Sequence, residues 1–330
     1  MRSCFGEASA TPVARQMDGS VSIRHPASQA PRMVRADAPS RGGATPLGLW
    51  LLRHRWALMA SFGLVVILYA RNFAKLVSDW SRDENYSHGF VVPIAFAWMV
   101  WQRRADLARL PVLPRPWGLA LIAMAVVQLL VGTLGAEFFV AHTSLLVLLS
   151  GMILYLVGTG IFRQLAFPVG WLLFMIPLPA IAFNAITFPL QLLASRLASG
   201  LLDLANVPNL REGNILHLSN FTLGVVEACS GVRSLISLVA LAALLGYFWF
   251  SGKPAQWILL ASAAPVAVGV NALRVAGTGV VGNYWGQRWA EGFFHAFSGW
   301  ALFLGAVVAL LAIARALAWR ARINPMGVVA

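Results

Sequence analysis

Long apolar runs recur along most of this chain and decide what it can fold into. Hydrophobic residues make up 59% of the 330 residues, and charged residues make up only 11%. Runs of about 20 apolar residues are long enough to cross the hydrocarbon core of a bilayer as helices. The pattern predicts an all-α polytopic membrane protein with about eight transmembrane helices. We expect spans at 55–70, 88–101, 117–135, 138–158, 162–178, 232–250, 256–281 and 295–315.

The formal net charge of +13 would also suit a protein that binds nucleic acid. The basic residues, however, cluster in the N-terminal tail and in short loops beside apolar segments, as cytoplasmic loops of membrane proteins do. We therefore expect membrane lipid, and no nucleic acid, among the partners. Cys4 lies in the polar tail and Cys229 in the apolar part, so we expect no disulfide framework.

The composition divides the chain into three parts. Residues 1–46 are rich in Ala, Ser, Pro and Arg, which predicts a disordered basic cytoplasmic tail. Residues 47–320 form the transmembrane domain, and residues 321–330 are expected to be a cytoplasmic C-terminal tail. A cleaved signal peptide is not expected, because the first apolar run starts only near Trp56.

Segment 183–206 is a ninth helical candidate whose course the sequence leaves open. It carries Arg196 and Asp203 and is amphipathic, so it either spans the membrane or lies along its outer face. The loop charges favour the outer face, because both termini then lie in the cytoplasm at the bacterial inner membrane. The basic positions that fall on the cytoplasmic side under this topology are Arg53, Arg55, Arg103, Arg104, Arg109, Arg115, Arg163, Lys253, Arg315, Arg320 and Arg322.

A polar insertion at 206–228 separates two apolar segments on the expected outer face. Its stretch 215–223 alternates apolar and polar residues around Ser219 and Asn220, which predicts a small external β-hairpin before Cys229. An ordinary external loop is an equally valid interpretation of so short an alternation.

Cys229 is the strongest candidate nucleophile in the chain. Ser230 can cap a helix that starts at Gly231, and the unpaired amides of a helix start favour a thiolate over a thiol. Arg233 follows on the same helical face and calls for a partner such as Glu227, the thiolate or a substrate carboxylate. The alternatives are a buried cysteine that only packs, and an arginine that contacts lipid headgroups.

Two further residues are expected at the same membrane level as Cys229. Arg274 lies inside the apolar run 256–281, where a guanidinium is costly unless it faces the bundle, a wet cavity or the headgroups. His295 opens the last span and can exchange a proton near neutral pH, although it can also be an interfacial histidine. Together the three residues supply a nucleophile, an oxyanion stabiliser and a proton carrier.

Several motifs in order resemble the exosortase/archaeosortase family, specifically the bacterial exosortases. They are the block Val225–Ser234 with its Cys229-Ser230-Gly231, the later Asn271-Ala272-Leu273-Arg274, and His295 followed by Gly299-Trp300. Asn85–Gly89 and Pro208–Asn214 are further matches, and the resemblance covers roughly residues 50–315.

This resemblance implies a membrane-embedded cysteine peptidase or transpeptidase. Its substrates would be secreted proteins with a C-terminal sorting tail of the PEP-CTERM type, which carries a Pro-Glu-Pro motif, a membrane helix and a basic end. The catalytic residues would be Cys229, Arg274 and His295, and the products would pass to an envelope or exopolysaccharide acceptor.

Three residues are weaker candidates for substrate binding. Arg233 and Arg211 can pair with the acidic centre of a sorting motif, although Arg211 can equally be a solvated loop charge beside Glu212. His88 lies outside under the same topology and either lines the substrate entrance or anchors the interface, like its neighbour Tyr86.

A transporter or flippase for an anionic envelope or exopolysaccharide precursor is the rival interpretation. Arg274 and Arg233 would then bind a phosphate or headgroup, and Cys229 would be incidental. No Gly-rich phosphate loop, zinc signature or serine elbow is found in the sequence, so we expect neither a cofactor nor a metal. His142, in the fourth expected span, is interpreted as a buried, hydrogen-bonded histidine.

Overall fold

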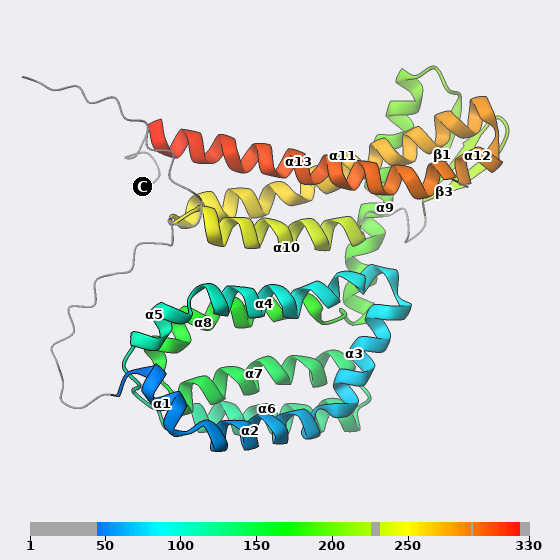
Figure 1. Ribbon diagram of the computed structural model, residues 1–330. Helices are drawn as coiled ribbons and strands as arrows, with labels where there is room; N and C mark the ends of the chain where they lie inside the picture. Colours follow the sequence, from blue (N-terminus) through cyan, green and yellow to red (C-terminus); the bar gives the residue numbers. More distant parts are fainter. Residues whose placement is uncertain (1–44, 226–231, 292, 324–330) are drawn as a thin grey trace, which may run out of the picture.

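The computed structural model describes residues 45–225, 232–291 and 293–323, and most of them are helical (Figure 1). The tail 1–44, the stretch 226–231 that contains Cys229, and the C-terminal end 324–330 lie outside the described residues. The domain boundaries expected from composition therefore stay predictions.

Each of the eight segments expected to span contains a helix, although not all of these helices are long enough to cross a bilayer alone. Five helices of the described part are long and apolar enough, or six if the pair bent by 78° near His54 is one span. The short ones include a helix of 12 residues and one of 13, because tight 3-10 turns adjoin them. The count of eight crossings therefore stays a prediction.

The helices form two groups that are joined by α9 (Ala180–Leu204). The N-terminal group comprises α1 (Leu47–Arg53), α2 (Arg55–Leu68), α3 (Ala70–Arg82), η2 (Glu84–Phe90), α4 (Val91–Gln102), α5 (Arg104–Arg109), α6 (Gly118–Leu134), α7 (Phe138–Leu156), α8 (Thr159–Trp171) and η3 (Leu172–Met175). The C-terminal group comprises α10 (Val232–Trp249), α11 (Lys253–Trp285), α12 (Gln287–Glu291) and α13 (Phe293–Ile323).

Each group has an apolar core of its own, and α10 contacts both. The N-terminal core includes Trp80, Met99 and Trp171, and the C-terminal core joins α10, α11 and α13 through residues such as Leu259 and Leu310. The ring of Tyr247 in α10 stacks on Phe167 in α8 with centroids 4.0 Å apart. The two groups are thus held together by packing as well as by chain connection.

Helix α9 runs across the ends of the other helices instead of alongside them (Figure 1). Its beginning packs into the N-terminal core through Phe183, and its end packs against α11 through Ala194, Ala198 and Leu202. Although α9 is long and apolar enough to span, this course agrees with the expectation that 183–206 lies across one face.

A three-stranded antiparallel sheet follows α9, in the order β1 (Asn209–Glu212), β2 (Ile215–Leu218) and β3 (Thr222–Gly224). The expected hairpin is confirmed as β2 and β3, whereas β1 was not predicted because only one of its four residues is apolar. The turn between β1 and β2 contains Gly213, whose φ of +63° suits a two-residue hairpin turn.

The sheet docks on α11 at a position where α11 carries glycine. A Cβ atom built on Gly282 would lie 2.1 Å from Cζ of Phe221, the buried aromatic residue before β3. The absence of a side chain at Gly282 therefore allows the sheet to approach the helix backbone closely.

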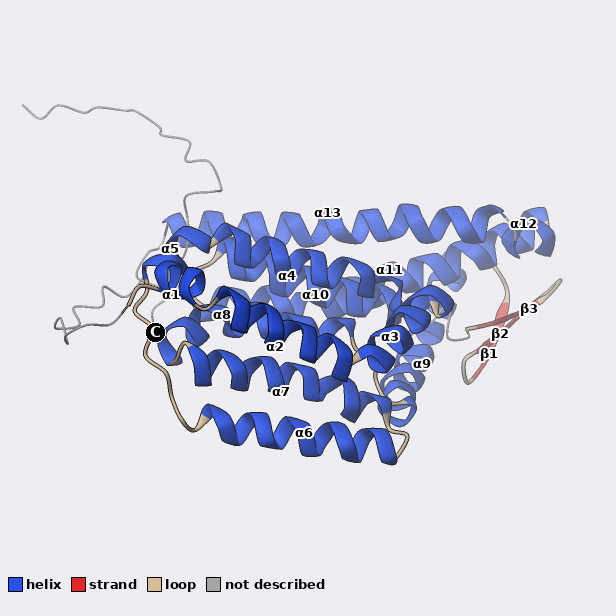
Figure 2. Ribbon diagram, turned by 60° about the horizontal axis from the view of Figure 1, so that its bottom comes forward, coloured by secondary structure: helices blue, strands red, loops and turns tan. Residues whose placement is uncertain are grey.

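Positive charge gathers at one end of the helices, which we call the basic end. It contains α1, α5 and the turns between α7 and α8 and between α10 and α11. The Leu47 amide donates to the Leu110 carbonyl at 2.9 Å, which joins α1 to the end of α5. The opposite end, which we call the site end, contains η2, η3, α9 and the sheet (Figure 2). The basic end holds Arg53, Arg55, Arg103, Arg104, Arg109, Arg115, Arg163, Lys253, Arg315 and Arg320.

Candidate active site

Arg274 lies about one bilayer thickness away from the basic end along α11. It is 21 residues after Lys253 in α11, which corresponds to about 32 Å of helix, close to the ~30 Å of a hydrocarbon core. The sequence places Arg274 within the apolar run 256–281 and predicts that it lies at the outer surface. Measured from the basic end, Arg274 is therefore at the far edge of a single crossing.

The guanidinium of Arg274 lies against α13 at Gly299. A Cβ atom built on Gly299 would be 3.2 Å from Nη2 and 3.3 Å from Cζ of Arg274. Gly299 is itself 21 residues before Arg320, so the same helical length, about 32 Å, separates it from the basic end. The antiparallel helices α11 and α13 thus meet at one level through this contact.

Arg274 also reaches the end of strand β3. A small cavity of about 10 Å³ lies between α11 and the strand. Two hydrogen bonds between Val225 and Asn214 fix the strand end there. The Val225 amide donates to the Asn214 backbone carbonyl at 2.8 Å, and the Asn214 side-chain amide donates to the Val225 carbonyl at 3.0 Å. The residues that line the cavity are Leu223, Gly224, Val225, Arg274, Val275 and Thr278.

Cys229 and the side chain of His295 lie outside what the structure describes. Position 295 is in the first turn of α13, one helical turn before Gly299, and positions four residues apart lie on the same face of a helix. Cys229 is one of the six residues between Val225 and Val232, the first residue of α10. The expected convergence of thiol, guanidinium and imidazole stays a prediction.

Arg233 is paired with a residue that the sequence did not single out. Its Nη2 atom lies 2.8 Å from Oε2 of Glu84, and the two side chains are 42% and 81% exposed. The expected partner Glu227 lies outside the described residues. The only signal for Glu84 was its place directly before the motif Asn85–Gly89.

Arg211 does not pair with its neighbour Glu212. It donates from Nη1 to the carbonyl of Gly213 at 2.9 Å, within its own hairpin turn. Glu212 instead lies 3.3 Å from the ring of His217 on strand β2. In the structure Arg211 is thus a residue of the sheet edge, and its role in substrate binding stays a prediction.

His88 and Tyr86 connect η2 to the turn after α8. The His88 ring lies 3.1 Å from the Phe174 carbonyl, and the Tyr86 hydroxyl accepts a bond from the Leu178 amide at 3.2 Å. Burial lowers the pKa of His88 below its ordinary value, and the bond to Phe174 partly opposes this shift. Tyr86 is buried, so it is not an exposed interfacial anchor.

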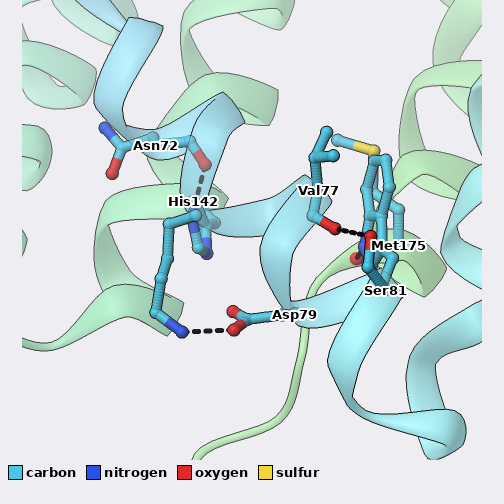
Figure 3. A network of polar contacts seen from close by, with 8 residues as sticks. Asn72, Val77, Asp79, Ser81, His142 and Met175 are labelled. Atoms are coloured by element: carbon cyan, nitrogen blue, oxygen red, sulfur yellow. Dashed lines mark hydrogen bonds and ion pairs between the residues drawn. The ribbon is translucent and has the colours of Figure 1, made fainter.

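A second polar cluster lies between α3, α7 and the turn after η3 (Figure 3). His142 is buried and its Nε2 atom lies 3.2 Å from the Asn72 carbonyl, which confirms the expected buried, hydrogen-bonded histidine. A cavity of about 230 Å³ beside it is lined also by Asp79, which pairs with Lys75, and by Glu137. Among the described residues, no group of three potential ligands is arranged to hold a metal ion.

The comparisons with known proteins agree with the motifs. The family model described as transmembrane exosortase matches residues 80–312, from the end of α3 into α13. Neither the curated proteins nor the solved structures give a match. The matched region is well over half of the chain and includes α10, α11, the sheet and most of α13. This chain therefore belongs to the transmembrane exosortase family, and it is a multi-pass membrane protein.

Proposed function

We propose that this exosortase is a cysteine peptidase or transpeptidase that cleaves a C-terminal sorting tail from secreted proteins. The observation that carries the proposal is the contact of the Arg274 guanidinium with Gly299, one turn from position 295 and beside the strand that leads toward Cys229. Val225, four residues before Cys229, and Gly299, four residues after position 295, both lie beside Arg274, which supports the proposal.

The basic end is the cytoplasmic face in this proposal. More than half of the lysines and arginines of the described part are there, with Asp106 as the one acidic residue. The site end instead carries Asp79, Asp83, Glu84 and Glu137. The positive-inside rule counts Lys and Arg alone, and their excess in the short connections of the basic end supports this orientation. The site end would then face the periplasm, where a secreted substrate is available.

In the proposed reaction, the Cys229 sulfur attacks the scissile carbonyl and His295 accepts the thiol proton. Arg274 donates hydrogen bonds to the oxyanion of the tetrahedral intermediate, for which the loss of one donor typically costs about 3–4 kcal/mol. Collapse of the intermediate breaks the C–N bond, and His295 protonates the departing amine. The resulting thioester is resolved by water or by an amine or hydroxyl nucleophile of an envelope acceptor.

Arg233 is the candidate for recognising the acidic residue of a Pro-Glu-Pro tail. It is exposed in the first turn of α10, shortly after Cys229 in the chain, and it already binds the carboxylate of Glu84. A substrate carboxylate can exchange with Glu84, because both partners are accessible to solvent. Arg211 and His88 remain weaker candidates for substrate binding.

The proposal is tested by co-expressing a secreted reporter that ends in a Pro-Glu-Pro motif, an apolar helix and a basic end. Wild-type enzyme is expected to shorten the reporter, whereas Cys229→Ala, Arg274→Ala and His295→Ala should leave the precursor intact. Cys4→Ala is the matched control and should cleave as the wild type does. Cleavage by Cys229→Ala would instead favour a role for the chain in which the thiol is incidental, such as transport of an anionic precursor.

A further inference from the structure

Gly299 stands at an interior position of α13, where glycine weakens a helix relative to alanine. Such a glycine is explained when the missing methyl group would strike a neighbour. At Gly299 this neighbour is the guanidinium of Arg274, with distances from a built Cβ of 3.2 Å to Nη2, 3.3 Å to Cζ and 3.7 Å to Nε. A methyl group there would force the guanidinium to move by a few tenths of an ångström.

Other glycines of the two helices do not make this kind of contact. Gly305, less than two turns further along α13, has nothing within 4 Å of a built Cβ atom. In α11, Gly279 and Gly282 face the apolar side chains of Leu202 and Phe221. Gly299 therefore differs from these glycines in that its missing side chain makes room for a charged group.

Arg274 is partly exposed, and it borders a small cavity at the strand end. The cavity that Arg274 lines together with Val225, Val275 and Thr278 has a volume of only about 10 Å³. This is near the minimum that admits one water molecule, about 10–15 Å³. This cavity therefore offers little room for a guanidinium that is displaced by a side chain at position 299.

We propose that Gly299 is a positioning residue that fixes where Arg274 presents its hydrogen-bond donors. The proposal rests on the proposed function, in which Arg274 stabilises the oxyanion. Donors of this kind act through their position relative to the reacting atoms. A displacement of Arg274 should therefore slow the acylation step more than it weakens substrate binding.

The matched pair Gly299→Ala and Gly305→Ala tests the positioning in the complete chain. With the purified enzyme and the sorting-tail reporter, Gly299→Ala should lower kcat by about 3- to 10-fold, since the displacement is a few tenths of an ångström. Its KM should stay within about twofold of the wild-type value, since the methyl group removes no substrate contact. Gly305→Ala should leave both constants unchanged. A wild-type kcat for Gly299→Ala would overturn the proposal.

A stability measurement tests the contact independently of cleavage. The thermal unfolding midpoint of Gly299→Ala should lie below that of Gly305→Ala, and the difference should vanish when both are combined with Arg274→Ala. A difference that persists without the guanidinium would show that the methyl group strikes something else, which overturns the proposal.

The two measurements also separate the failure of this proposal from the failure of the proposed function. If the wild type leaves the reporter intact, the peptidase proposal fails, and the stability comparison alone decides whether Gly299 positions Arg274. If Gly299→Ala does not accumulate, recovery of the protein in the double variant with Arg274→Ala supports the contact, and no recovery overturns it.

Discussion

The carboxylate of Glu84 lies 2.8 Å from the guanidinium of Arg233 and joins η2 to the first turn of α10. The residues are 149 positions apart in the chain, and they connect the N-terminal and C-terminal helix groups at the site end. Because both side chains are exposed, this pair should contribute little to stability. Its importance lies in fixing a positive charge close to Cys229 in the chain.

Replacement of Glu84 by Gln should therefore affect substrate recognition more than folding. If a substrate carboxylate exchanges with Glu84, Glu84→Gln lowers KM for an acidic tail and Arg233→Ala raises it, each by about two- to fivefold. Steady-state cleavage of the reporter measures both, with Glu212→Gln as the control at the same end. A rise of KM in both variants would mean that Glu84 orients Arg233 instead of competing for it.

Gly282→Ala should destabilise the protein by separating the sheet from α11. A methyl group would lie 2.1 Å from Cζ of Phe221, and overpacking of this kind costs about 1–3 kcal/mol. Gly269→Ala is the control on the same helix, since nothing lies within 4 Å of a Cβ atom there. Thermal unfolding in detergent measures the effect, and equal midpoints for the two variants would refute the close docking.

Trp80→Phe should also destabilise the protein. Trp80 is buried and its Nε1 atom donates to the Met175 carbonyl at 2.8 Å, so phenylalanine leaves that carbonyl without its partner. The expected loss is about 1–3 kcal/mol in the free energy of unfolding. Trp257→Phe, at a position that is 66% exposed, should cause a much smaller loss, and similar losses for both variants would contradict this role.

His88 should make stability depend on pH. Its pKa is lowered in the folded protein, chiefly by burial, from an ordinary value of about 6.5. The unfolded chain therefore binds more protons as the pH falls through 6.5, and stability is lost in that range until the pH drops below the folded pKa.

The measurement is the unfolding midpoint of wild type and His88→Gln between pH 7.5 and pH 5. The wild type should lose more stability on acidification than His88→Gln does. An unchanged pH dependence in His88→Gln would show that other groups cause it.

The sequence by itself determined the class of the protein, its family and the order of its motifs along the chain. Apolar runs fixed the helical segments, because only helices satisfy backbone polar groups in lipid without help from neighbouring segments. The family was identifiable because its motifs are local runs such as Glu227–Arg233 and Asn271–Arg274. The β2–β3 hairpin was predictable from alternation, whereas β1 has no such pattern and forms by pairing with β2.

Only the tertiary structure decided which distant residues meet. Sequence spacing could not show that Glu84 pairs with Arg233, that α9 runs across the helix ends, or that Arg274 rests on Gly299. These contacts depend on how separate helices pack against each other, and a local periodicity reports only which face of each helix is apolar. The depth of Arg274 likewise required the helix start at Lys253, from which the 21 residues to Arg274 are counted.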